Sequence, residues 1–130
     1  MRIADICTRH VVTIPPGATV REAADVMRRR EVGSLVVADG AESERIPHGI
    51  VTDRDVALSI ADRGVDPDAV TVADTMARSL VSCAEDADIY DVLRRMRGNG
   101  VRRMPVIDAR GHLLGIVTAD DIIGALSACR

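Results

Sequence analysis

The chain has 130 residues, 47% of them apolar and 28% charged, and a formal net charge of −3, which is enough for one compact domain or a fused pair of half-domains with a real core. All 17 basic residues are arginine, which excludes mechanisms that need a lysine, such as a Schiff base or a P-loop. Tyr90 is the one residue of the Phe/Trp/Tyr class, so base stacking is not available, and the net negative charge predicts neither nucleic-acid nor membrane binding.

Apolar periodicity and turn residues predict two successive sets of strands and helices. A leader over 1–18 with a strand at 11–14 precedes a capped helix over 19–30 (Thr19 with Glu22), a strand over 35–37, a polar loop over 40–47, a strand over 49–51 and a helix over 53–61. Gly64 and Asp66–Pro67 mark a linker. A leader-like stretch over 70–76, a strand over 80–82, a helix over 89–97, a turn over 98–100, strands over 104–107 and 114–117, and a helix over 120–128 follow.

The two sets are copies of one another. Gly49–Asp55 (GIVTDRD) returns as Gly115–Asp121 (GIVTADD), 66 residues later. The apolar stripe of the first helix returns 69 residues later in the second, as Val20, Ala23, Ala24 and Met27 followed by Ile89, Val92, Leu93 and Met96. A repeat of this length is a supersecondary unit that has been duplicated.

Each copy predicts a β-α-β-β-α unit, so the expected fold class is α+β, also described as α/β. A three-stranded sheet cannot bury both faces of its helices alone, and we therefore expect the units to pack sheet to sheet with pseudo-two-fold symmetry. The predicted division is 1–64 for the first repeat with its leader and 65–130 for the linker and second repeat. A ligand site is expected in the groove between the repeats.

A Thr-x-x-Asp motif stands at one strand-to-helix junction of each copy, as Thr52 with Asp55 and Thr118 with Asp121. One interpretation is a helix N-cap that satisfies free backbone N–H groups. The other is a ligand site, because a helix N-terminus suits phosphate and an aspartate can accept two ribose hydroxyls. Duplication of the whole Gly-apolar-apolar-Thr frame favours the ligand site.

Two arginines, Arg102 and Arg103, precede the strand Met104–Ile107. Neighbours on a strand face opposite ways, so at least one guanidinium should face the groove near the Thr/Asp turns, where it would bind phosphate oxygens. The alternative is a pair of surface arginines matched with acids. The first copy has Gly33–Ser34 at these positions, so the two copies are not equivalent.

The cysteines and histidines predict neither disulfides nor a metal site. Cys7, Cys83 and Cys129 are odd in number and widely spaced, and no histidine has a partner at ligand spacing. No signal peptide and no membrane span is apparent, so a reducing cytoplasm is the expected compartment. No nucleophile–base pair can be assembled, and we do not expect an enzyme.

The motifs Val72–Met76 (VADTM), Val101–Val106 (VRRMPV) and GIVT-x-x-D twice resemble those of a tandem pair of cystathionine β-synthase (CBS) domains, a Bateman module. The resemblance covers about residues 1–128, and more loosely it extends to stand-alone bacterial two-CBS proteins of stress or hypoxic responses. The chain departs from the family pattern at Gly33–Ser34, at Val36, where proline is frequent, and at Cys7, where methionine is usual.

The resemblance implies an adenosine ligand between the repeats: AMP, ADP, ATP or S-adenosylmethionine. It implies that Asp55 and Asp121 hold ribose and that Thr52 and Thr118 contact the α-phosphate. Arg102 and Arg103 match the basic pair that reaches phosphates. The positions implied for the adenine pockets are Asp5, His10, Val32, Gly33, Asp74 and Ser79.

Three functions remain, in this order. The first is a regulatory module in which an adenine nucleotide shifts a packing equilibrium that a partner protein senses, with no required cofactor and a homodimer as the expected state. The second is a structural protein that dimerises through apolar helix faces such as Val56/Ile60 and Ile122/Ile123/Leu126. The third is a thiol redox switch.

Overall fold

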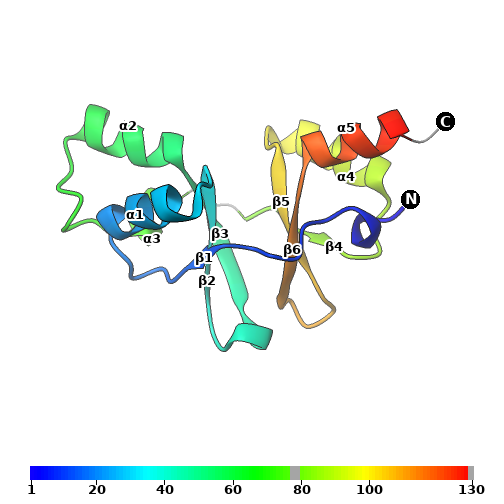
Figure 1. Ribbon diagram of the computed structural model, residues 1–130, viewed down its shortest axis with the longest axis horizontal. Helices are drawn as coiled ribbons and strands as arrows, with labels where there is room; N and C mark the ends of the chain where they lie inside the picture. The colour runs from blue at the N-terminus through cyan, green and yellow to red at the C-terminus, as the bar shows by residue number, and fades with distance from the viewer. Residues whose placement is uncertain (77–79, 129–130) are drawn as a thin grey trace. The chain divides into compact units, whose positions relative to one another are not determined.

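The computed structural model describes residues 1–76 and 80–128, and it divides into two compact units (Figure 1). Val12–Leu80 forms one of them, which we call the continuous unit. Met1–Val11 together with Val81–Arg130 forms the other, which we call the split unit. Ser79 and Cys129, two residues singled out from the sequence, lie outside the described residues.

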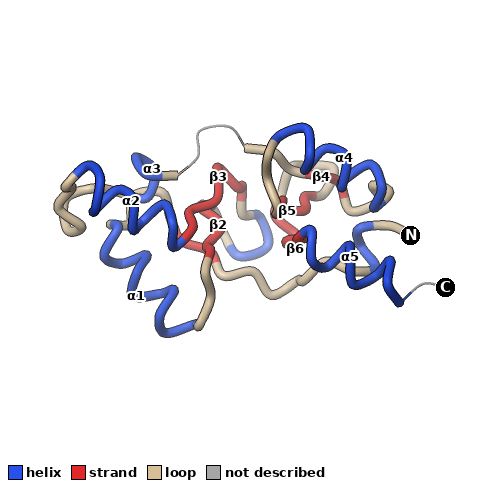
Figure 2. Tube along the Cα trace, turned by 90° about the horizontal axis from the view of Figure 1, so that it is seen from above, coloured by secondary structure: helices blue, strands red, loops and turns tan. Residues whose placement is uncertain are grey.

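The continuous unit contains a three-stranded sheet in the order β1-β2-β3, with β1 parallel to β2 and β2 antiparallel to β3. Helices α1 and α2 pack against each other and cover one face of this sheet (Figures 1 and 2). Its elements are β1 (Thr13–Ile14), α1 (Val20–Arg30), β2 (Ser34–Asp39), the 3-10 turn Glu42–Glu44, β3 (Ile46–Thr52), α2 (Asp53–Arg63) and α3 (Val72–Thr75).

The split unit repeats this topology with the sheet order β4-β5-β6. Its elements are the 3-10 turn Ile3–Asp5, β4 (Cys83–Ala84), α4 (Ile89–Asn99), β5 (Arg103–Ile107), β6 (Leu113–Thr118) and α5 (Ala119–Ala128). The predicted α+β class with two β-α-β-β-α units is thus confirmed. The sheet-to-sheet packing of the units stays a prediction.

Each unit has its own apolar core, built mainly from aliphatic residues. The stripe predicted for α1 lies in the continuous unit's core, where Val20 and Ala23 are fully buried. The matching stripe of α4 lies in the split unit's core, where Ile89 and Val92 are buried. The 3.6-residue period of these stripes therefore positions both helices on their sheets.

The first eleven residues of the leader pack with the second repeat and not with the one that follows them in sequence. The Ile3 N–H donates to the Ala87 carbonyl at 3.0 Å, and Thr8 exchanges two backbone bonds of 2.9 Å with Ile116 on the free edge of β6. The leader-like stretch over 70–76 packs with the continuous unit, where the Val72 N–H donates to the Ala18 carbonyl at 2.8 Å. The compact units therefore do not coincide with residues 1–64 and 65–130, and that division stays a prediction about the duplicated sequence.

Several predicted boundaries were wrong. The strand expected over 80–82 lies at Cys83–Ala84, because only these residues pair with β5. The turn expected over 98–100 is shorter, since Gly98 and Asn99 continue α4 and Gly100 ends it at φ 66°. The polar loop expected over 40–47 holds a 3-10 turn, and β3 begins within it at Ile46.

The cap predicted at the start of α1 forms only in part. The Thr19 hydroxyl accepts the Glu22 N–H at 3.1 Å, as expected of an N-cap. The reciprocal bond, from the Thr19 N–H to the Glu22 carboxylate, is not among those of the described residues. The predicted capping box is therefore a simple hydroxyl cap.

Candidate functional site

Both Thr-x-x-Asp motifs form complete capping boxes at the starts of α2 and α5. The Thr52 hydroxyl accepts the Asp55 N–H at 3.1 Å, and the Asp55 Oδ2 accepts the Thr52 N–H at 2.9 Å. Thr118 and Asp121 form the same two bonds at 3.1 and 3.0 Å. The capping interpretation is therefore confirmed in both units.

The capping bonds leave ligand-binding capacity at each turn. A threonine hydroxyl that accepts one hydrogen bond can still donate another, and a carboxylate that uses Oδ2 retains Oδ1. No further hydrogen bond to these atoms occurs within residues 1–76 and 80–128. All four side chains are half-buried, so the cap and a ligand contact are compatible.

The strand register decides what lies beside each threonine. Arg103 is the direct partner of Thr118 across β5 and β6, and Ser34 is the partner of Thr52 across β2 and β3. Register partners in an antiparallel pair present their side chains on the same face. The split unit therefore brings Arg103, Thr118 and Asp121 together, as the sequence predicted for a phosphate site.

Arg102 faces a different neighbour from Arg103. Its guanidinium forms an ion pair of 3.2 Å with Asp120, and both side chains are exposed. Its backbone carbonyl accepts the Ala119 N–H at 2.8 Å, which fixes the start of α5 against the start of β5. The interpretation as a surface ion pair is therefore confirmed for Arg102, and the phosphate role of Arg103 stays a prediction.

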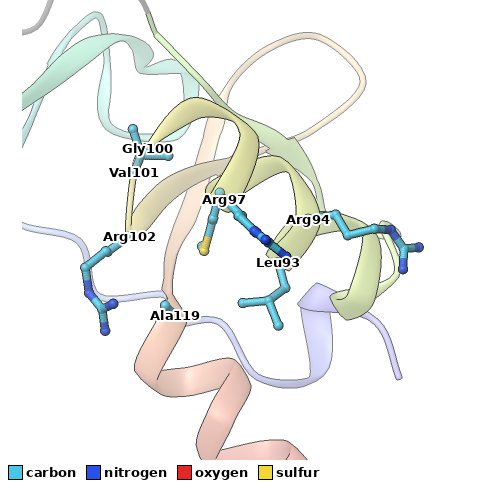
Figure 3. Close-up of a pocket in the computed structure, with 8 residues that line it drawn as sticks. Leu93, Arg94, Arg97, Gly100, Val101, Arg102 and Ala119 are labelled. Carbon is cyan, nitrogen blue, oxygen red and sulfur yellow. The ribbon is translucent and has the colours of Figure 1, made fainter.

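A pocket of about 540 Å³ opens between α4, the start of β5 and the start of α5 in the split unit (Figure 3). Leu93, Arg97 and Val101 are among its lining residues, together with Arg102 and Ala119. Figure 3 shows Arg102 and Arg94 extending to opposite sides, with Arg97 and Leu93 between them. Arg94 and Arg97, which no sequence motif had singled out, lie three residues apart on one side of α4 and line this pocket.

Asp5 and Asp74 hold equivalent positions on the short turns Ile3–Asp5 and α3. The Asp5 carboxylate accepts the Arg2 N–H at 3.1 Å, and the Asp74 carboxylate accepts the Thr71 hydroxyl at 3.1 Å. Both side chains are exposed. Their predicted place in the adenine pockets stays a prediction.

The remaining predicted positions divide between the units. Val32 and Gly33 lie between α1 and β2 of the continuous unit, where the Gly33 carbonyl accepts the Asp53 N–H at 2.9 Å beside the Thr52 turn. His10 lies exposed in the leader of the split unit. Among the described residues it forms no hydrogen bond or ion pair with the Thr118 turn. Its predicted role also stays open.

The apolar faces proposed for dimerisation need a correction. Val56 and Ile122 are 7% and 0% exposed and belong to the cores of their units, so they cannot form a docking face. Leu126 packs against the split unit's core. Ile60 and Ile123 are 43% and 54% exposed, and they alone of the five keep that possibility.

The described residues of the split unit include two free cysteines, Cys83, which is buried, and Cys7, which is half-buried. Cys83 is paired with Val106 on β5, and Val106 is paired with Gly115 on β6, next to the Cys7 sulfur. Two strand spacings, about 9–10 Å, therefore separate the Cα atoms of Cys83 and Gly115. The thiol switch stays a prediction. Burial, the largest cause, raises the pKa of the Cys83 thiol to about 11.

We expect Cys83 to react with an alkylating reagent at pH 7 about 100-fold more slowly than an unperturbed thiol, because the raised pKa reduces its thiolate fraction. Peptide mapping after timed alkylation measures this, and urea should abolish the difference. The stabilising effect of the neutral thiol is fully present below the ordinary pKa of 9.0 and is lost as pH rises toward 11. Rapid labelling of Cys83 in the folded protein would contradict its placement.

The described residues contain no group of three or more His, Cys, Asp or Glu side chains arranged for a metal ion. His48 and His112 each lie near a single aspartate, at 3.1 Å from Asp39 and 3.8 Å from Asp108. Within the same residues, no helix has both the length and the apolar character that crossing a bilayer requires.

The two units repeat one topology, each with a capped Thr-x-x-Asp turn at the end of its third strand, and together they define a tandem-repeat module. The model of the CBS domain family matches residues 3–62 and 72–128. The chain belongs to the CBS domain family.

Relatives of this chain include proteins from archaea and bacteria. Uncharacterized protein MK0525 of Methanopyrus kandleri is 33% identical over 121 residues, and the chain spans 60% of that protein's length. Hypoxic response protein 1 of Mycobacterium tuberculosis is 33% identical over 118 residues, which cover 91% of this chain and 80% of that protein. The CBS domain pair of protein MJ0100, crystallised with 5′-methylthioadenosine and S-adenosyl-L-methionine, is 25% identical, with a TM-score of 0.82 over 97% of this chain and 99% of that one.

Proposed function

We propose that this protein is a regulatory module that binds an adenosine-containing ligand, AMP, ADP, ATP or S-adenosylmethionine, at its two Thr-x-x-Asp turns. The observation that carries the proposal is the geometry of these turns. Each keeps a threonine hydroxyl donor and a carboxylate oxygen available after capping its helix. The ligands crystallised with the MJ0100 pair, which shares this fold, are both adenosine derivatives.

In this proposal Asp55 and Asp121 accept ribose hydroxyls through Oδ1. Thr52 and Thr118 donate to the group attached at the 5′ carbon, and Arg103 adds a charge-assisted bond when that group is a phosphate. Asp5, His10, Val32, Gly33, Asp74 and Ser79 complete the proposed adenine pockets.

Binding becomes a signal if the ligand favours one conformation of the pair over another. The shift cannot exceed the difference in the ligand's binding free energy for the two states. We propose that a partner protein in the cytoplasm reads this shift as an energy or stress signal, with binding and not catalysis as the activity. A homodimer using the exposed Ile60 and Ile123 is the proposed assembly.

Thermal unfolding against AMP, ADP, ATP and S-adenosylmethionine tests the proposal. A ligand at about 100 times its dissociation constant should stabilise the fold by roughly 2.7 kcal/mol, a shift of several degrees for a domain of this size. Inosine monophosphate serves as the control with a changed base. The absence of a shift with every adenosine ligand would refute the proposal.

The double substitution Asp55→Asn with Asp121→Asn should weaken the stabilising ligand by at least tenfold, because each removes a charged acceptor of two ribose hydroxyls. Asparagine keeps an oxygen that can accept the capping N–H, so the fold should persist. Calorimetric titration measures the affinity. Unchanged affinity in a folded double variant would rule out the ribose role.

A further inference from the structure

The threonines of the two turns have different neighbours across the sheet. Arg103 stands directly opposite Thr118, whereas Ser34 stands opposite Thr52. Such partners hold their Cβ atoms about 4.5–5.5 Å apart on one face. A group bound at the Thr118 hydroxyl therefore meets a guanidinium, and a group bound at Thr52 meets a neutral hydroxyl.

The units also differ in charge where the residue before the central strand meets the start of the last helix of the repeat. The Ala119 N–H donates to the Arg102 carbonyl at 2.8 Å, and the Asp53 N–H donates to the Gly33 carbonyl at 2.9 Å. These pairs hold equivalent places at the starts of α5 and α2. The Asp53 Oδ2 lies 3.2 Å from the position that a Cβ at residue 33 would take. The continuous unit thus places a carboxylate where the split unit carries an arginine.

The second residue of these two helices also differs in charge, since it is Arg54 in α2 and Asp120 in α5. Asp120 accepts from Arg102 at 3.2 Å, so it partly neutralises Arg102 and leaves Arg103 as the cation beside Thr118. Arg54, which matches Asp120, is exposed, and its guanidinium forms no ion pair in the part of the chain that the structure describes. The Asp53 carboxylate directly follows Thr52 in the chain, and its Oδ1 accepts the Arg54 N–H at 2.8 Å while its Oδ2 lies beside Gly33.

We propose that the Thr52 turn binds a nucleoside whose 5′-group is uncharged or positive, and that the Thr118 turn binds a 5′-phosphorylated nucleoside. This inference rests on the proposed function and specifies the ligand class of each turn. Like charges repel, so the Asp53 carboxylate next to the Thr52 turn disfavours a phosphate there and favours a sulfonium. The Arg103 fork matches phosphate oxygens.

Calorimetric titration with AMP and 5′-methylthioadenosine tests the inference, because these nucleosides differ only at the 5′-group. In the full chain, Asp121→Asn leaves the Thr52 turn intact, and Asp55→Asn leaves the Thr118 turn intact. The D121N protein should prefer 5′-methylthioadenosine by about tenfold or more, and the D55N protein should prefer AMP by a similar factor.

A variant that removes the Asp53 charge and keeps the side-chain shape tests whether this residue causes the preference. In the D121N background, Asp53→Asn should raise AMP affinity by roughly three- to tenfold and leave 5′-methylthioadenosine unchanged. Asp53 is exposed and lies outside the capping box, so the fold should persist, which an unchanged unfolding midpoint without ligand would verify. The preference should shrink between about 0.05 and 0.5 M salt, because ions screen exposed charges.

The outcomes separate this inference from the proposed function. One contrary result is equal binding of both nucleosides by the D121N protein, and another is an unchanged preference after Asp53→Asn is added. Either result would overturn the proposed selection of ligands by charge and leave adenosine binding in place. A preference that salt does not reduce would overturn it as well. If the wild-type protein bound neither nucleoside, the proposed function and this inference would both fail.

Discussion

Replacing Gly115 with alanine should lower the free energy of unfolding by about 1–3 kcal/mol, the usual cost of overpacking. A Cβ at this position would lie 2.6 Å from the Thr8 carbonyl oxygen, closer than real Cβ atoms approach. That same oxygen accepts the Ile116 N–H at 2.9 Å. The added methyl group therefore forces the leader away from β6 and breaks its bridge. Urea denaturation measures the loss.

Gly98→Ala is the matched control for this substitution. Gly98 lies inside α4, and a Cβ there would meet nothing within 4 Å. Alanine is favoured over glycine in a helix, so the control should gain about 0.5–1 kcal/mol. A gain at both positions would contradict the close approach of the leader to Gly115.

Ile122→Ala should cost about 2–5 kcal/mol, because it removes a fully buried side chain and leaves a cavity. Ile122 is 0% exposed and belongs to the core cluster that contains Ile3, Met104 and Val117. These residues come from the leader, β5 and β6, so the cavity would weaken every layer of the split unit. The change in the midpoint of urea denaturation gives the cost.

The neighbouring residue supplies the comparison. Ile123 is 54% exposed on the same helix, and Ile123→Ala should change stability by no more than about 0.5 kcal/mol in the dilute protein. The two substitutions change the same residue type on the same helix, so a difference in their effects reports the difference in burial. Equal small effects at both positions would show that Ile122 is not a core residue.

The duplication made most of the fold predictable from sequence. Once one copy predicts a strand, a helix and a Thr-x-x-Asp turn, the second copy tests each element independently. Both turns formed the capping boxes that the motif specifies, because those bonds join residues only three apart. Local patterns of this kind do not depend on the rest of the fold.

Local sequence patterns did not predict which distant segments pair with each other. The whole leader was expected with the first repeat, yet the backbone bonds that its first eleven residues form with the rest of the chain go to residues 85, 87, 89 and 116. Apolar periodicity shows that a segment is buried but does not identify its partner. The position of β4 was missed for a similar reason, since a two-residue strand exists only through its pairing with β5.

The charge at each turn was predictable only in part. Gly33–Ser34 stood out against Arg102–Arg103, so unequal turns were expected. The contribution of Asp53 was missed, because it depends on how closely its carboxylate approaches Gly33. The alignment of Asp53 with Ala119 shows that the two helices begin with residues of different charge. It would have predicted a charge difference at the turns only if the contact between the starts of β2 and α2 had been known.

The split unit has a consequence for how the protein is made. Residues 12–80 form a continuous stretch, so the continuous unit can fold as soon as it leaves the ribosome. The leader is synthesised first, but the edge it covers, on β6, is synthesised more than one hundred residues later. The first segment to emerge is thus among the last to find its place, and it waits exposed, with Ile3 and Ile6 unprotected, until synthesis is nearly complete.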